Sequence, residues 1–249
     1  ARNRVVSTWN LETGEAANIL EHDANLKTIS VSNDQQWIAG SDWGGNFIVW
    51  GAESGNERWR INTNGADGQP NGINHVAFSP DDQVIATTYN DRRLLVVFDA
   101  TSGEEEFALG PFQDSPHKVS FSPDGRWIVT AMGNGMGKAM IINVAERKVA
   151  THFSQEGGHM QATFDPSGDR IATAHVDGTI NLWSWNGKQL ENVMSWPAIH
   201  SHAPGDRIIF NLAFSTDGTY LASTDRKNRV KVWNVRSGEL LATLKSRDA

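Results

Sequence analysis

A short turn motif recurs five times along this chain of 249 residues, and it constrains the fold more than any other feature. The copies are rich in Ser, Pro, Asp and Gly, and they lie at Ser32–Gln35, Ser79–Asp82, Ser122–Gly125, Asp165–Gly168 and Ser215–Gly218. Segments in which apolar residues alternate with others flank the copies, such as "HVAF" before the second copy and "VIATT" after it. Alternating segments joined by a tight turn are typical of β-hairpins.

A third apolar segment follows every hairpin, and a glycine-containing turn and a short fourth segment come after it. The third segments end at Trp50, Phe98, Asn143, Trp183 and Trp233, and a similar segment before the first hairpin ends at Trp9. These ends recur about every 40 to 50 residues, close to the period of four-stranded propeller blades. Because no helical periodicity interrupts the pattern, the sequence predicts an all-β propeller of four-stranded antiparallel blades.

The repeats resemble the WD-repeat β-propeller family along essentially the whole chain, most completely at 165–183 and 215–233. The chain has no Trp-Asp dipeptide. Asp99 keeps the Asp, but Phe98 replaces the Trp before it. His22 lies at the family's usual distance before its strand, and Asp177 matches the family's turn aspartate. The resemblance therefore implies an incomplete buried hydrogen-bond tetrad, with packing of the strand-ending residues as the main source of stability. These expected structural residues are His22, Asp177, Trp9, Trp50, Phe98, Trp183 and Trp233.

The strand pattern places five complete blades and the outer half of another in a single propeller domain spanning 1–249. The blades are expected at about 1–21 (the outer half), 22–62, 72–110, 116–156, 157–195 and 206–247. A blade without its first two strands exposes an apolar face and an unpaired strand edge. We expect this domain to be part of a seven-bladed ring, completed by an upstream part of the same protein or by another protomer. A smaller ring closed by a distorted blade is the alternative.

The composition excludes several classes of protein. The absence of Cys rules out disulfide scaffolds and thiolate metal sites. The net charge of −7 disfavours a nucleic-acid partner held by phosphate contacts. No apolar run reaches the roughly 20 residues that span a bilayer, and the first residues lack the apolar stretch of a signal peptide. We therefore expect a cytoplasmic protein with no membrane partner and no cofactor.

The resemblance implies a non-catalytic platform that binds a protein or peptide through the loops between second and third strands and between blades. The sticky side chains on these loops form the expected partner-binding face: Trp43, Tyr89, Arg92, Met132, Met136, His175, Trp196 and Arg226. Trp, Tyr and Arg dominate binding hot spots, and Trp43 is the first choice because Trp50 already ends the strand in its blade. The basic tips at Arg92 and Arg226 also favour an anionic partner. Similar divergent repeats serve as the sensor or scaffold domain of larger bacterial signalling or defence proteins.

Two other functions stay open at this stage. One is a propeller enzyme with a metal or acid/base site at the central channel, for which the candidates are His75, His117 and His159 near the starts of three successive first strands. The pair His200 and His202 in a Pro-rich connection is a further metal candidate. The other is a structural scaffold completed by oligomerisation. The metal content distinguishes the metal-dependent enzyme from a metal-free platform, and light scattering distinguishes the oligomeric scaffold from a monomer.

Overall fold

Hairpins of the predicted kind build the whole of the described structure. The computed structural model describes residues 5–9, 12–21, 25–64, 72–133, 138–154, 159–196, 208–225 and 229–245. These residues form 22 strands, arranged as five four-stranded sheets and one two-stranded sheet, with the strands of each sheet in chain order. The predicted all-β fold class is confirmed. In this part of the chain no helix is long and apolar enough to span a membrane.

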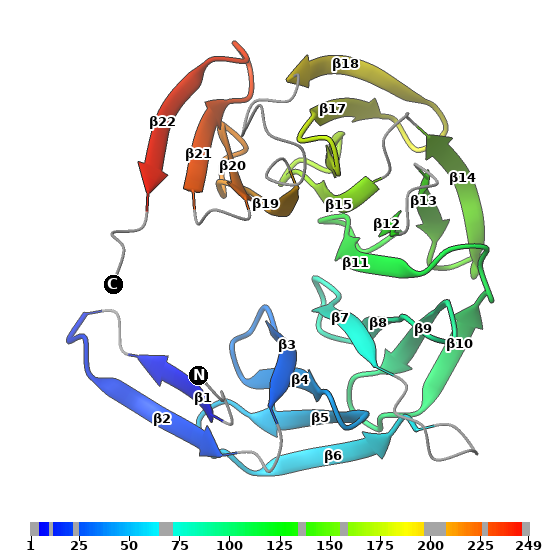
Figure 1. Cartoon of the computed structure of the whole chain (residues 1–249). Helices are drawn as coiled ribbons and strands as arrows, with labels where there is room; N and C mark the ends of the chain where they lie inside the picture. Colours follow the sequence, from blue (N-terminus) through cyan, green and yellow to red (C-terminus); the bar gives the residue numbers. More distant parts are fainter. Residues whose placement is uncertain are drawn as a thin grey trace. The chain divides into compact units, whose positions relative to one another are not determined.

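The chain divides into two compact units, and the first comprises Ala1–Pro116. Its strands pair antiparallel within a two-stranded sheet (β1 and β2) and two four-stranded sheets (β3 to β6 and β7 to β10). The first strands β3 and β7 lie side by side (Figure 1). The bounds are β1 Val5–Trp9, β2 Ala16–Glu21, β3 Leu26–Val31, β4 Trp37–Asp42, β5 Asn46–Gly51, β6 Glu57–Asn62, β7 Ile73–Phe78, β8 Val84–Tyr89, β9 Leu94–Asp99 and β10 Glu105–Leu109.

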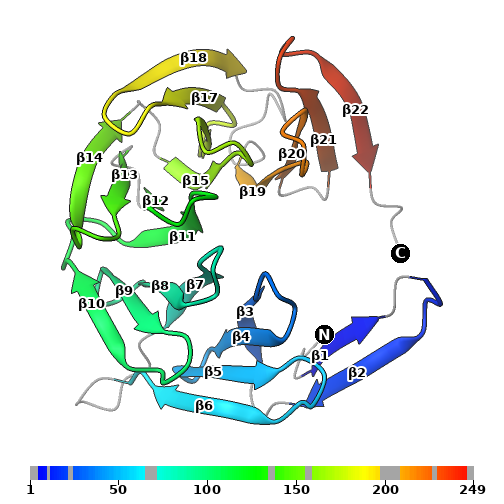
Figure 2. The ribbon, with the colours of Figure 1, turned by 180° about the vertical axis from the view of Figure 1, so that it is seen from behind.

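The second unit comprises His117–Ala249 and contains three four-stranded sheets. Figure 2 shows its successive sheets, each with a long outermost strand (β14, β18 or β22). The bounds are β11 Pro116–Phe121, β12 Trp127–Met132, β13 Lys138–Asn143, β14 Lys148–Ser154, β15 His159–Phe164, β16 Arg170–His175, β17 Ile180–Trp185, β18 Leu190–Trp196, β19 Ile209–Phe214, β20 Tyr220–Asp225, β21 Arg229–Asn234 and β22 Leu240–Lys245.

The core of each unit lies between neighbouring sheets, because the middle strands are buried on both faces. In the first unit Phe47 packs against Trp59 and against Phe98 of the next sheet, with ring centroids 5.1 and 5.5 Å apart. In the second unit Phe153 and Trp183 meet in the same way, with centroids 5.1 Å apart. Burying each such side chain contributes roughly 1.5–3 kcal/mol, so these contacts supply much of the stability.

The recurrent turn is held by a side-chain hydrogen bond between its Ser and its Asp. In the first copy Ser32 Oγ donates to Asp34 Oδ1 at 2.6 Å and accepts from the backbone N–H of Trp37 at 2.9 Å. Three further copies repeat the Ser-to-Asp bond. The copy at Asp165–Gly168 reverses the order, since Ser167 Oγ donates to the carboxylate of Asp165. The turn therefore closes the same way in every hairpin.

The antiparallel register shows which residues end the third strands as core anchors. Trp50, Phe98, Trp183 and Trp233 pair with the second-strand residues Ile38, Ile85, Ile171 and Leu221 and are buried. In the sheet β11 to β14 the equivalent residue is Ile142, which pairs with Ile128, and not Asn143. Trp9, the expected anchor of β1, is 58% exposed in a sheet of two described strands.

Side chains also tie each sheet to the next within a unit. Trp59 on β6 donates its indole N–H to the carbonyl of Ala100 in the following sheet at 3.0 Å. Asp82 accepts hydrogen bonds from the backbone N–H groups of Asn33 and Asp34, at 2.6 and 2.9 Å. Hydrogen bonds of this kind fix neighbouring sheets in one relative position, which in turn fixes where their loops lie.

Candidate functional site

The last residue of each second strand points into the core and does not reach a loop surface. Five buried side chains share this place in the five four-stranded sheets: Asp42, Tyr89, Met132, His175 and Asp225. The expectation that Tyr89, Met132 and His175 belong to a partner-binding face is therefore corrected, because a partner cannot touch a side chain that is buried in the core. Burial also raises the pKa of Tyr89 to about 12.

His175 belongs to a buried polar network in the sheet β15 to β18. Its Nε2 lies 2.7 Å from Asn181 Nδ2 and 3.5 Å from Thr173 Oγ1. The indole N–H of Trp183 donates to the same Thr173 hydroxyl at 2.9 Å. Burial lowers the pKa of His175, and the charge of Asp177 acts in the opposite direction. The neutral imidazole is favoured here, which suits a structural role.

The indole-to-hydroxyl bond is also present in the sheet β19 to β22, where Trp233 donates to Ser223 Oγ at 3.1 Å. The other sheets lack one of the two groups. Phe98 and Ile142 have no N–H to donate, and Gly40 has no hydroxyl to accept from Trp50. The structure thus records this bond in two of the five sheets. Asp177 accepts from the backbone N–H of Thr179 at 2.8 Å, as a turn aspartate does.

Two of the buried strand-end residues are aspartates that the sequence analysis does not single out. Asp42 accepts from the backbone N–H and side-chain amide of Asn46, at 2.9 and 2.8 Å. Asp225 accepts from the backbone N–H of Arg229 at 3.1 Å and pairs with its guanidinium Nε at 2.6 Å. Each follows a small hydroxyl residue at the end of an alternating strand, in "GSD" and "STD". A Ser-Asp or Thr-Asp pair at the end of a second strand is therefore the sequence signal for a buried aspartate.

Trp196 was expected on a loop but is a core residue between two sheets. Its indole N–H donates to the carbonyl of Gly238 at 2.8 Å, and its ring centroid lies 6.1 Å from that of Trp233. This expectation is corrected as well. The strand β18 is one residue longer than most and carries Trp196 onto the turn of the next sheet.

Trp43 is the exposed exception, and its surroundings form a defined surface in the first unit. The side chain stands in the loop between β4 and β5 and is 63% exposed. The Lys27 ammonium lies 4.8 Å from the centroid of the Trp43 ring, within cation–π range. Lys27 Nζ also donates to Asn74 Oδ1 on β7 at 2.9 Å. We call Lys27, Trp43, Asn74 and Asp91 the Trp43 surface.

Electrostatics link Lys27 to the neighbouring loop. Burial lowers the pKa of Lys27, and the charge of Asp91 raises it in part. Arg92, which follows Asp91 in the loop between β8 and β9, is exposed as the sequence predicts. The loop between β8 and β9 thus carries both the carboxylate that acts on Lys27 and the exposed Arg92.

A groove of about 520 Å³ begins at Lys27 and runs between β1 and β3. Polar and apolar side chains line it: Val6, Ser7, Trp9, Leu26, Lys27, Thr28 and Ile29. Trp9 and Ile29 are exposed, so the groove offers apolar contact area beside the Trp43 surface. A groove with apolar contact area next to an exposed aromatic residue is typical of a surface that binds a partner.

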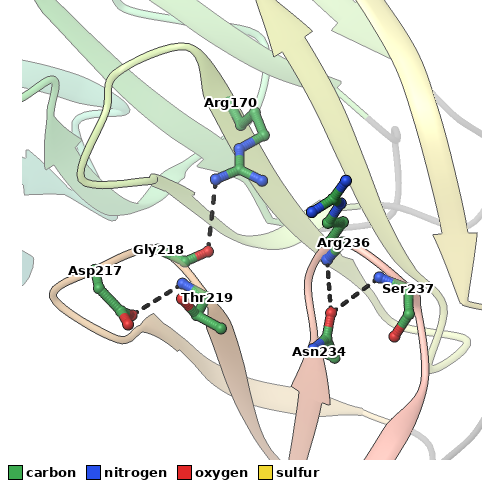
Figure 3. A pocket seen from close by; sticks show the side chains of 7 residues that line it. All are labelled: Arg170, Asp217, Gly218, Thr219, Asn234, Arg236 and Ser237. Carbon is green, nitrogen blue, oxygen red and sulfur yellow. Dashed lines mark hydrogen bonds between the residues drawn. The ribbon is translucent and has the colours of Figure 1, made fainter.

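A second cavity, of about 730 Å³, lies in the second unit between the β19–β20 and β21–β22 turns (Figure 3). Its charged lining residues are Arg170, Asp217 and Arg236. Arg170 already pairs with the buried carboxylate of Asp165 at 2.8 Å. Hydrogen bonds, first of all from Ser215, lower the pKa of Asp217 to about 2, so it is ionised and offsets Arg236. The cavity is polar with balanced charges and carries no catalytic pair.

The metal candidates do not gather into a site in the part of the chain that the structure describes. No group of three or more His, Asp or Glu placed to hold a metal occurs there. His117 lies against Gly133, where an added Cβ would stand 2.0 Å from the imidazole Nε2. His75 sits on β7, paired in register with Thr88. His22, Met136, His200, His202, Arg226 and the side chain of His159 lie outside the described residues.

Comparison with protein families finds the model "WD domain, G-beta repeat" at residues 63–96, 150–184 and 197–234. The chain is 28% identical over 225 residues to a periodic tryptophan protein 2 homolog of Dictyostelium discoideum, covering 88% of this chain and 22% of that protein. It is 24% identical over 185 residues to a guanine nucleotide-binding protein subunit beta of rice, covering 69% of this chain and 47% of that protein. The chain thus spans less than half the length of either relative.

Among solved structures, the chain is similar to the Cps50 (Swd1) beta-propeller domain of Myceliophthora thermophila. The TM-score is 0.81 at 16% identity, and the match covers 98% of this chain and 80% of that one. At this level of identity the likeness concerns the fold alone, which is that of a β-propeller.

Proposed function

This chain belongs to the WD-repeat β-propeller family, and from that premise we propose that it is a non-catalytic platform that binds a protein or peptide through the Trp43 surface. The observation that carries the proposal is the exposure of Trp43 together with the fixed position of its neighbour Lys27. A large aromatic side chain left in solvent costs free energy unless a partner covers it. The names of two relatives describe them as subunits, one of chromatin assembly factor 1 and one of a guanine nucleotide-binding protein.

The geometry reduces the entropic cost of binding. The amide of Asn74 and the indole of Trp43 hold the Lys27 ammonium between them, so this long side chain is ordered before a partner arrives. Ordering a side chain of this type on binding costs about 0.5–1.5 kcal/mol, and a preordered lysine avoids that cost. The loops that carry Trp43 and Arg92 follow rigid strands, which favours a fixed binding surface.

We propose an acidic peptide as the ligand type, because the Lys27 ammonium lies beside Trp43 and the loop that carries Asp91 also exposes Arg92. The test is selection from a displayed peptide library on the whole chain, followed by affinity measurement for the Trp43→Ala variant. Loss of a hot-spot tryptophan weakens binding by roughly 30-fold or more. Tyr220→Ala is the matched control, because it removes an exposed aromatic residue from the second unit. Equal affinity of Trp43→Ala and the parent for every selected peptide would falsify the proposal.

We further propose that the domain serves as a cytoplasmic sensor or scaffold within a longer signalling or defence protein, with additional strands completing a seven-bladed ring. The exposed Trp9 supports this, as does β1, which among the described strands is hydrogen-bonded to β2 alone. Strands from another part of the same protein or from another protomer would cover both. Light scattering and limited proteolysis of the longer protein test this: exposure of Trp9 to a fluorescence quencher falls if further strands cover it.

A further inference from the structure

Lys118 on β11 carries an ammonium group that faces no carboxylate in the described part of the second unit. Its Nζ donates to Asn211 Oδ1 and, at 3.2 Å, to the carbonyl of Leu212, both on β19. Burial alone lowers the pKa of Lys118 to about 8, with no opposing charge that raises it. An ammonium has three N–H donors, so one donor is left after these two bonds. A negatively charged group would both pair with this donor and stabilise the cation.

The residues around Lys118 are polar and uncharged. Gln161 on β15 and Asn211 on β19 occupy the position of Lys118 on β11, three residues before the final Phe of each first strand. Two residues further along, Ser120 Oγ lies 3.4 Å from Thr163 Oγ1. Gln161 Oε1 is buried and has no hydrogen-bond partner among the described residues. Matching positions of three first strands thus carry one amine, two amides and two hydroxyls, and the Gln161 amide must turn its NH2 group, not Oε1, toward an anion.

Lys27 in the first unit is a natural comparison, because it also lies on a first strand and donates to an Asn Oδ1 of a neighbouring sheet. Burial lowers its pKa as well. However, the charge of Asp91 raises the pKa of Lys27 in part, and the Trp43 ring faces its ammonium. Lys27 therefore has compensating negative potential, and Lys118 lacks it.

We propose that Lys118, with Gln161, Asn211 and the Ser120–Thr163 hydroxyl pair, forms a binding site for a carboxylate group. A single negative charge matches the single ammonium, whereas a doubly charged phosphate leaves a net charge on a half-buried surface. The carboxylate accepts the remaining N–H of Lys118. The Ser120 and Thr163 hydroxyls, which otherwise donate to the carbonyls of Phe121 and Phe164 at 3.4 Å, turn to donate to it. An acidic side chain and a free carboxyl terminus of a peptide supply the same chemistry. The site is separate from the Trp43 surface and stands without it.

The test is competitive labelling of the amines of the whole chain with a limiting acylating reagent, read residue by residue by mass spectrometry across pH. Sodium acetate is the probe, and sodium chloride at equal ionic strength is the control. Bound acetate is expected to raise the pKa of Lys118 by about one unit, which slows its labelling at pH 8 about fivefold, because the fraction of free amine falls by that factor. Labelling of Lys27 is expected to change less than twofold. Acetyl-glutamate amide and acetyl-glycine then distinguish a side-chain carboxylate from a terminal one.

The variants separate binding from folding. Gln161→Ala and Lys118→Met are made in the whole chain, and circular dichroism verifies that each folds. In Gln161→Ala the acetate concentration for half-maximal protection of Lys118 is expected to rise several-fold. Bound acetate is also expected to raise the melting temperature of the parent chain until the site is saturated. This rise is expected to disappear in Lys118→Met and to remain in Lys27→Met. The proposal is overturned if acetate slows Lys118 no more than chloride does, or if Lys118→Met keeps the acetate response. Neither result bears on peptide binding at Trp43.

Discussion

The indole nitrogen of Trp196 donates a 2.8 Å hydrogen bond to the carbonyl oxygen of Gly238, and so joins the sheet β15 to β18 to the turn of the following sheet. Replacement by Phe keeps most of the ring and removes this N–H. We expect Trp196→Phe to lower the free energy of unfolding by about 1–2 kcal/mol, from the lost bond and the smaller ring. Urea denaturation measures it. Trp43→Phe is the control and is expected to change stability by less than about 0.5 kcal/mol, because Trp43 is exposed. Equal effects of the two substitutions would show that the hydrogen bond contributes nothing.

Gly103 lies beneath the ring of Trp59. A Cβ at Gly103 would stand 2.9 Å from Trp59 Cδ2, and the backbone there has φ +76°. Gly14 has a similar φ of +72°, with nothing within 4 Å of an added Cβ. Both Gly→Ala substitutions therefore cost about 1 kcal/mol of backbone strain. Gly103→Ala is expected to cost roughly 1–3 kcal/mol more, because the indole must move. Thermal unfolding of the two variants checks the difference, and a similar shift for both would mean that the Trp59 contact is loose.

Asp82 has a positive φ of 59°, at a place where later turns of the motif have Gly. Its carboxylate accepts two backbone N–H bonds from the turn of the preceding sheet. Gln35 has nearly the same φ, 61°, and is the matched position in the first turn. Replacement by Gly relieves strain at both positions, but at Asp82 it also removes two charge-assisted bonds. We expect Asp82→Gly to be less stable than Gln35→Gly by about 1–3 kcal/mol in urea denaturation. If the two variants have the same stability, the cross-sheet bonds do not stabilise the fold.

Tyr89 makes stability depend on pH in the alkaline range. Burial raises its folded pKa to about 12 from the ordinary value of 10. Between these values the folded protein holds the phenolic proton and the unfolded chain releases it, so stability falls as pH rises from about 10 to 12 and is unaffected by this group below that range. The expected loss is on the order of 2–3 kcal/mol. Denaturation at pH 9 and pH 11.5 measures the slope. In Tyr89→Phe the part of the pH dependence that comes from Tyr89 should be absent. If the stability of the variant falls as steeply as that of the parent, another group causes the fall.

The hairpins and their grouping into sheets were predictable because both signals are local. Alternation over a few residues and the Ser/Asp chemistry of the turn act within one hairpin, so they identify its strands without knowledge of the neighbouring sheet. Trp183 and Trp233 could be identified as anchors for the same reason. Asn143 ends β13 as predicted, but it is not the anchor of its sheet, because the antiparallel pairing places Ile142 opposite Ile128.

The candidate site was predictable only in part. Trp43 and Arg92 are exposed on loops as expected. Tyr89 and Trp196 are buried against the sheet next to their own, and Met132 is buried as well. A single sequence contains no direct signal for that covering. Lys118 was missed for a similar reason: its acceptor Asn211 lies on another first strand, two sheets further along the chain.

The bonds between sheets also bear on how the chain can assemble. Trp59 and Ala100 are 41 residues apart in sequence, Trp196 and Gly238 are 42 apart, and Asp82 and Asn33 are 49 apart. The entropy lost on closing a loop grows only with the logarithm of its length, so these three closures cost almost the same. None needs a contact across the whole chain. A sheet can therefore dock on its predecessor as soon as about fifty further residues leave the ribosome, which favours assembly in the order of synthesis.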